Sequence, residues 1–153
     1  MAANNSEDSK GRAWALLLTT HAQLIERVEA AFVASELPPL AWYDVLWELE
    51  KAPDGRLRMR ELAQRVVITR SNLTRLIDRL ETAGVIAREA CPDDRRGAYA
   101  VLNAAGRAMR KKMWPVYSQQ IDVLFASHLT APEAKQLATS LRKLLAPLQE
   151  ASR

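Results

Sequence analysis

Arginines and short hydrogen-bonding side chains recur at helical spacing between residues 69 and 83. The apolar residues of this segment (Leu73, Leu76, Ile77 and Leu80) fall on one helical face and leave a polar face opposite. Arginine forks match guanine edges and phosphates, Asn, Ser and Thr bond bases or phosphates, and the free amides of a first helical turn bind a phosphate. The pattern predicts a helix that reads the major groove of double-stranded DNA, and an ordinary amphipathic surface helix is the alternative. The candidate DNA-binding residues here are Thr69, Arg70, Ser71, Asn72, Thr74, Arg75 and Arg79.

A second group of candidate DNA-binding residues lies in a polar loop, residues 91–97, between two short segments that are typical of strands, residues 85–87 and 98–102. The segment is predicted to be a β-hairpin with a charged tip, where Arg95 and Arg96 could enter a minor groove or clamp phosphates. Asp93 and Asp94 are interpreted as partners that orient these arginines. A merely solvated turn is the alternative.

The positive charge is concentrated in the middle of the chain. Residues 55–97 contain ten arginines and six acidic residues, which accounts for the whole net charge of +4. No lysine occurs between Lys51 and Lys111. Because arginine makes two-point contacts with phosphate and guanine that lysine makes less well, this distribution indicates a nucleic-acid face. A solvated charged face would give a similar count.

The elements that would position these residues are mainly helices. Apolar spacing predicts a long helix over residues 12–35, ended by Pro38 and Pro39, and a second over residues 40–51. A very short strand around Leu57 and Met59 precedes a helix over residues 60–66, which a tight turn joins to the helix that ends before Gly84. Helices after Asn103 and from Thr130 to Glu150 follow. The predicted fold class is therefore mainly α with a small β-hairpin, a winged helix-turn-helix.

Composition limits the other possibilities. With 153 residues, 48% of them hydrophobic, the chain suits one domain with a core. Residues 1–11 read as a disordered arm without the apolar segment of a signal peptide. No apolar run reaches membrane-spanning length, and Cys91 is the only cysteine, so we expect a cytoplasmic protein. Neither histidine has metal-ligand spacing and no Gly-rich phosphate loop occurs, so we expect no enzyme, metal or cofactor.

Three sequence runs resemble the MarR family of bacterial regulators. They are residues 40–46, residues 71–86 (with Ser71 to Glu81 and Ala83 to Ile86 carrying the likeness), and the run Asp94-Arg95-Arg96-Gly97 followed by Val101-Leu102-Asn103 and Gly106. The likeness spans residues 12–150. The family usually has threonine where Asn103 stands, and asparagine caps a helix equally well.

The resemblance implies a recognition helix over residues 70–83 and a wing that uses Arg95 and Arg96. It implies a homodimer built from residues 12–37 and 104–150, with residues 38–103 as the DNA-binding region. The many apolar residues of the terminal helices support that dimer independently, because a small winged domain could not cover them. A two-fold dimer would place two recognition helices ~34 Å apart on a pseudo-palindromic operator. Repression is the family tendency.

The resemblance also suggests a small aromatic or phenolic effector that releases the DNA. The candidate contacts are Trp14, His21, Trp42 and Tyr43, although residues of these types at helical spacing are more often core residues than ligand contacts. Redox sensing by Cys91 is not expected, because oxidant-sensing relatives carry their reactive cysteine near the start of the first helix, whereas Cys91 begins the wing. A winged domain that binds only protein is the rival function.

Overall fold

The computed structural model describes the backbone of residues 2–66 and 70–150, and the side chains of residues 8–66 and 72–150. Contacts divide the chain into two units, with the boundary between Tyr117 and Ser118 inside helix α5 (Ala104–Leu124). The mainly helical winged helix-turn-helix fold with a β-hairpin is confirmed, and a third strand joins the hairpin to form one three-stranded antiparallel sheet. Within the described residues, no helix is both long and apolar enough to cross a membrane.

Residues 40–102 of the first unit form what we call the winged lobe. Its elements are α2 (Leu40–Lys51), the 3-10 turn η1 (Pro53–Gly55), β1 (Arg56–Arg58), α3 (Met59–Arg65), α4 (Arg70–Thr82), β2 (Ile86–Cys91) and β3 (Asp94–Leu102). Its core collects the apolar faces of the three helices and the inner residues of the strands. Among them Leu46, Leu62 and Ile77 have no exposed surface. Each such side chain contributes about 1.5–3 kcal/mol by burial, so this core is the main stabilising feature of the lobe.

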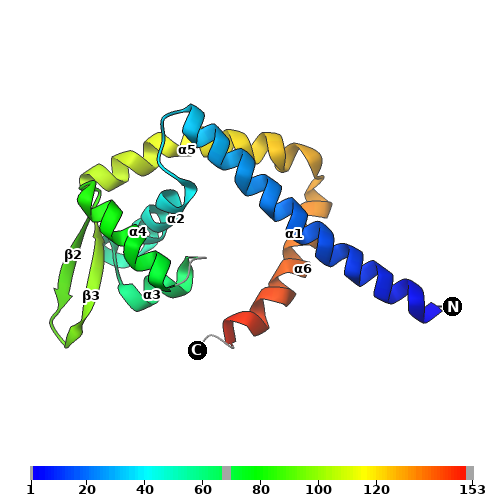
Figure 1. Ribbon diagram of the computed structural model, residues 1–153, viewed down its shortest axis with the longest axis horizontal. Coiled ribbons are helices and arrows are strands. Elements are labelled where there is room, and N and C mark those ends of the chain that lie inside the picture. The colour runs from blue at the N-terminus through cyan, green and yellow to red at the C-terminus, as the bar shows by residue number, and fades with distance from the viewer. Residues whose placement is uncertain (1, 67–69, 151–153) are drawn as a thin grey trace. The chain divides into compact units, whose positions relative to one another are not determined.

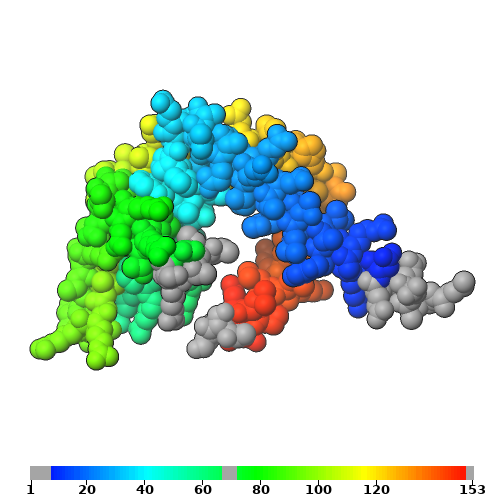
Figure 2. Space-filling view, in the orientation of Figure 1, coloured from blue at the N-terminus to red at the C-terminus, as the bar shows by residue number. Residues whose placement is uncertain are grey.

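The sheet has the order β1-β3-β2, and Figure 1 shows β2 and β3 extending away from α2, α3 and α4. The same hairpin projects as a narrow wing in the space-filling view (Figure 2). The strands are longer than expected, and Pro92 and Asp93 alone form the turn in place of a loop over residues 91–97. Because Ala87–Ala90 are all exposed, this stretch lacks the apolar alternation by which a strand is recognised in sequence.

The end of α4 has the local signal that the sequence predicts. α4 ends in a Schellman motif: Gly84 has φ 73°, its amide donates to Glu81 O, and the amide of Val85 donates to Leu80 O at 3.1 Å. α3 begins at Met59 rather than Arg60, because the Glu61 carboxylate accepts the Arg58 amide at 3.0 Å. The expected N-cap of α4, Thr69, lies outside the described residues.

Asn103 caps α5 as predicted and also fastens that helix to the lobe. Its side-chain oxygen accepts the Gly106 amide at 2.9 Å, and its side-chain amide donates to Gly84 O at 2.7 Å. A side chain at Gly106 would place its Cβ 2.1 Å from Val85 O. Glycine is therefore required where the first turn of α5 meets the chain entering β2.

In the second unit, the short turn η2 (Ala126–His128) precedes α6 (Ala131–Glu150). The predicted capping box is present, because the Thr130 amide donates to Glu133 Oε2 at 2.8 Å and the Glu133 amide donates to Thr130 Oγ1 at 3.5 Å. The Thr130 hydroxyl, which donates to Glu133 Oε2 at 2.7 Å, and after it the Thr130 amide lower the pKa of Glu133. Pro147 lies inside α6, which continues to Glu150.

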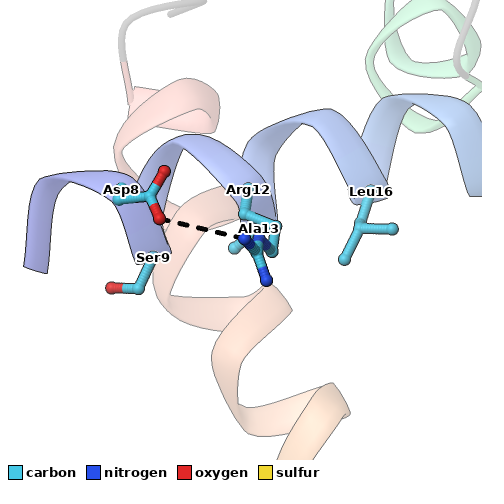
Figure 3. A pocket seen from close by; sticks show the side chains of 5 residues that line it. All are labelled: Asp8, Ser9, Arg12, Ala13 and Leu16. Carbon is cyan, nitrogen blue, oxygen red and sulfur yellow. Dashed lines mark ion pairs between the residues drawn. The ribbon is translucent and has the colours of Figure 1, made fainter. Parts of the chain in front are cut away.

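Helix α1 (Ala2–Ala34) begins ten residues before the predicted start at Arg12. The disordered arm expected for residues 1–11 is therefore wrong for Ala2–Gly11, which are helical. No proline interrupts the segment, and the single Gly11 costs only about 1 kcal/mol in a helix. Asp8 and Arg12 are one turn apart, with their charged groups 3.8 Å from each other (Figure 3).

Candidate nucleic-acid interface

Helix α4 separates a buried face from an exposed polar face, as the sequence predicted. Leu73, Ile77 and Leu80 are buried in the core of the winged lobe. The side chains of Asn72, Thr74, Arg75 and Arg79 are exposed. Arg70 starts the helix, but its side chain and that of Ser71 are outside the described ones, as is the whole of Thr69. The described part of α4 thus presents two arginines, an amide and a hydroxyl to solvent.

The short helix α3 and the hairpin flank α4. α2 packs against both α3 and α4, and α4 packs against β2. At the wing, Arg95 and Arg96 are exposed beside the turn. The α4 helix and the wing tip therefore belong to one packed lobe, which is the arrangement that a winged helix-turn-helix uses on duplex DNA.

Asp94 shapes the wing turn through the backbone. Its Oδ1 accepts the backbone amide of Arg96 at 3.0 Å, and a Cβ at Gly97 would lie 2.9 Å from its Oδ2. Among the described side chains, no ion pair joins Asp93 or Asp94 to Arg95 or Arg96. The hypothesis that these acids orient the arginine side chains directly is thus replaced for Asp94 by control of the turn itself.

Some of the ten arginines of residues 55–97 make contacts with other residues of the lobe. The guanidinium carbons of Arg56 and Arg58 lie 4.9 and 5.7 Å from the Tyr99 ring centroid, within cation–π range. Arg58 Nε also donates to Tyr99 Oη at 3.3 Å, and this hydrogen bond raises the pKa of the Arg58 guanidinium. Arg88 on β2 pairs with Asp78 and Glu81 of α4. The number of arginines in the sequence does not predict which of them make contacts within the lobe, because strand register and helix packing determine their partners.

An aromatic cluster joins α1, α2 and α5. Tyr43 is buried, stacks on Trp114 with ring centroids 6.0 Å apart, and lies 5.0 Å from Tyr117, which also contacts Phe32. Asp44 follows Tyr43 on α2. Its pKa is raised to about 6, mainly by burial and further by the negative charges of Glu48 and Glu29.

Of the expected effector contacts, Tyr43 alone belongs to this cluster. Trp42 is half-buried against the lobe core, whereas Trp14 is 63% exposed and His21 is exposed on α1. Ring contacts in the described part of the chain include neither Trp14 nor Trp42. A shallow depression on α1 is lined by Asp8, Ser9, Arg12, Ala13 and Leu16 (Figure 3). Side chains from one helix cannot enclose a ligand, so this depression is not a candidate effector site.

Known proteins resemble this chain in sequence and in fold. A sequence model described as MarR family matches residues 36–97. The uncharacterised HTH-type regulator YkoM of Bacillus subtilis is 33% identical over 89 residues, 58% of this chain and 57% of YkoM. The HTH-type transcriptional repressor Rv2887 of Mycobacterium tuberculosis is 33% identical over 88 residues, 58% of this chain and 63% of Rv2887. The matches thus span less than two thirds of either curated relative.

A solved structure extends the likeness over nearly the whole chain. Sco3205 of Streptomyces coelicolor, a MarR family transcriptional regulator crystallised in complex with DNA, is 29% identical with a TM-score of 0.86, covering 93% of this chain and 89% of Sco3205. The sequence match falls on the winged lobe, and the structural match includes the terminal helices. The chain is thus similar to MarR family transcriptional regulators, in sequence over the winged lobe and in structure over nearly its whole length.

Proposed function

We propose that the protein is a non-catalytic, sequence-specific DNA-binding regulator that binds a pseudo-palindromic operator as a homodimer. The observation that carries this proposal is the exposed polar face of α4, with Arg75 and Arg79 opposite a fully packed apolar face. The exposed Arg95 and Arg96 of the wing add a second contact to the same DNA. The DNA complex of Sco3205 supports this mode of action.

Unburied apolar side chains support the homodimer. α6 buries none of its residues, and Leu141, Leu144, Leu145 and Leu148 form one helical stripe with exposures of 39–64%. α1 likewise exposes apolar side chains, among them Trp14, Leu16 and Leu18. Such contiguous apolar surface is uncommon in monomers, and a second copy of the chain would cover it.

Repression is the proposed outcome of DNA binding, because Rv2887 is named as a repressor. A protein that covers an operator beside a promoter blocks transcription by occupancy alone. The proposed location is the cytoplasm, where bacterial DNA is accessible. A reporter gene behind the operator should become more active when the gene for this protein is deleted, and lower activity would indicate an activator.

Release by a small aromatic molecule is the finer part of the proposal. Tyr43, Trp114 and Tyr117 form an aromatic surface between α1, α2 and α5, with Trp114 44% exposed. A flat aromatic ligand that inserts there would separate α2 from α5 and displace α4 through α2. Titration with phenols and aromatic acids should quench tryptophan fluorescence and weaken DNA binding together, and a Tyr43→Ala variant should lose both responses.

The DNA proposal is tested by a gel-shift titration with the intergenic DNA beside the gene, against scrambled DNA of equal length. A discrete shift competed only by the specific duplex is expected. Arg75→Ala should weaken specific binding by about 1–3 kcal/mol through lost base contacts. Lys112→Ala, which removes one exposed positive charge from α5, is the matched control and should bind like the parent.

Arg96→Ala should also weaken binding, with less change in sequence preference, because a wing contacts the backbone or minor groove. If Arg75→Ala and Arg96→Ala both bound like the parent, the assigned DNA face would be wrong. Equal weak binding of the parent to specific and scrambled DNA would favour the rival function, a winged domain whose partner is a protein.

A further inference from the structure

Arg88 connects the wing to the recognition helix through two acids. It lies on β2, and its Nη2 pairs with Asp78 Oδ1 while its Nε lies 3.1 Å from Glu81 Oε2. Asp78 and Glu81 are one helical turn apart on α4, so a single guanidinium reaches both. The three side chains are 32%, 57% and 44% exposed, respectively.

The same two acids lie beside the DNA-facing arginines. Asp78 follows Arg75 by three residues, a spacing at which opposite charges on a helix attract each other. In the structure Asp78 pairs with Arg88 instead, and within the described residues no ion pair is formed by Arg75 or Arg79. The flank of α4 that faces β2 thus holds the negative charge away from the exposed arginines.

We propose that Arg88 is a positioning residue of the DNA interface: by holding Asp78 and Glu81 against β2, it keeps Arg75 available for DNA. This inference rests on the proposed DNA-binding function. Exposed ion pairs contribute little to stability, so holding the fold together is a poor explanation for the arrangement. A carboxylate released beside Arg75 would both pair with that arginine and repel phosphate.

The test is a rescue experiment on operator DNA. Arg88→Ala should weaken specific binding by about three- to ten-fold, the scale set by one or two exposed ion pairs. Adding Asp78→Asn and Glu81→Gln to Arg88→Ala should restore most of the affinity. The same two acid substitutions in the parent measure the general effect of removing negative charge, and they should strengthen binding less than they do in the Arg88→Ala background.

Three outcomes would overturn the proposal. Arg88→Ala could bind as the parent does, or its loss could remain after the acids are removed, which would indicate a direct DNA contact or a folding defect. A thermal melt of each variant identifies a folding defect. If the acids gave equal gains in both backgrounds, their effect would not depend on Arg88.

A measurement without DNA keeps this inference separate from the proposed function. In the free protein, NMR of the Arg75 guanidinium Nε–H should show slower solvent exchange in Arg88→Ala, because Asp78 then pairs with Arg75, and Asp78→Asn should reverse the change. An unchanged Arg75 signal would contradict the inference even if the parent binds DNA. Failure of the parent to prefer its operator would instead contradict the proposed function.

Discussion

The winged lobe and the terminal helices use similar apolar residues in opposite ways. In the lobe, α2, α3 and α4 each bury leucines completely, and the strands close the same core. In α6, a stripe of four leucines remains exposed and no residue is buried. The lobe therefore buries its leucines within one chain, whereas the stripe of α6 would be buried only in the proposed dimer. This difference predicts that the effects of substitutions on stability depend on protein concentration for α6 and not for the lobe.

The largest effect is expected in the lobe core. Leu46→Ala removes a side chain with no exposed surface and should lower the free energy of unfolding by about 2–5 kcal/mol. Urea titration at two protein concentrations a hundredfold apart should give the same loss at both, because the cavity lies within one chain. A loss that changed with concentration would mean that the stability of the lobe also depends on a partner.

The second effect is expected in the exposed leucines of α6. Leu144, 56% exposed, lies in the middle of the apolar stripe. Leu144→Glu puts one carboxylate from each copy into the proposed dimer contact and removes a burial worth about 1.5–3 kcal/mol per side chain, so the dimer should dissociate at micromolar concentration. Sedimentation should report a monomer.

Gln136→Glu is the control for this experiment, because it adds the same charge to the exposed surface of α6 away from the stripe. That variant should sediment as the parent does. If Leu144→Glu also kept the parent's mass, the stripe would lie outside the contact between copies and the α6 part of the dimer proposal would fail.

Local features of the fold were predictable from the sequence in both regions. Helix ends were predictable because their signals are local: Gly84 in a positive-φ position, Asn103 as a cap, and Thr130 with Glu133 as a capping box. The buried face of α4 followed from spacing alone. The roles of the exposed α4 and wing arginines remain predictions, because exposure permits a DNA contact without establishing one.

The sequence alone did not predict which side chains contact each other across the fold. Arg58 meets Tyr99 because β1 pairs with β3 in a register that sets them opposite each other. Arg88 meets Asp78 because β2 packs against α4. The helical start of α1 was missed for another reason, since polar residues at a chain terminus give weak periodicity in either state. The composition treats all these arginines as one DNA face. In the structure, some of them contact other residues of the lobe and others are exposed on α4 and the wing.

The third effect concerns the seam where α1 meets the lobe. The Glu29 carboxylate of α1 accepts the Leu40 amide of α2 at 3.0 Å, and Asp44 lies one turn further along α2. Burial, then Glu48 and Glu29, raise the pKa of Asp44 from 3.8 to about 6. A raised carboxyl pKa means that the folded state holds its proton more tightly. The stabilisation is complete below pH 3.8 and is lost as the pH rises through about 6.

Asp44→Asn removes this cost of ionisation. At pH 7.5 the variant should be more stable than the parent by about 1–2 kcal/mol, a value reduced from the full shift because the group is partly solvated. At pH 4.5 the gain should be smaller. Thermal melts at both pH values test this, with the exposed Asp122→Asn of α5 as control. An equal gain at both pH values would show that ionisation of Asp44 is not the cause.

The smallest effect lies where α5 leaves the lobe. Asn103 makes two bonds, a cap to the Gly106 amide and a donation to Gly84 O, whereas threonine, the usual family residue, could make only the first. Asn103→Ala should cost about 1–2 kcal/mol through both bonds. Asn103→Thr should cost about half as much, because its hydroxyl replaces the cap and leaves Gly84 O to water. Urea titration of the two variants separates the contributions of the two bonds to the free energy of unfolding. Equal losses in Asn103→Ala and Asn103→Thr would mean that the bond to Gly84 O, and not the cap, provides the stabilisation.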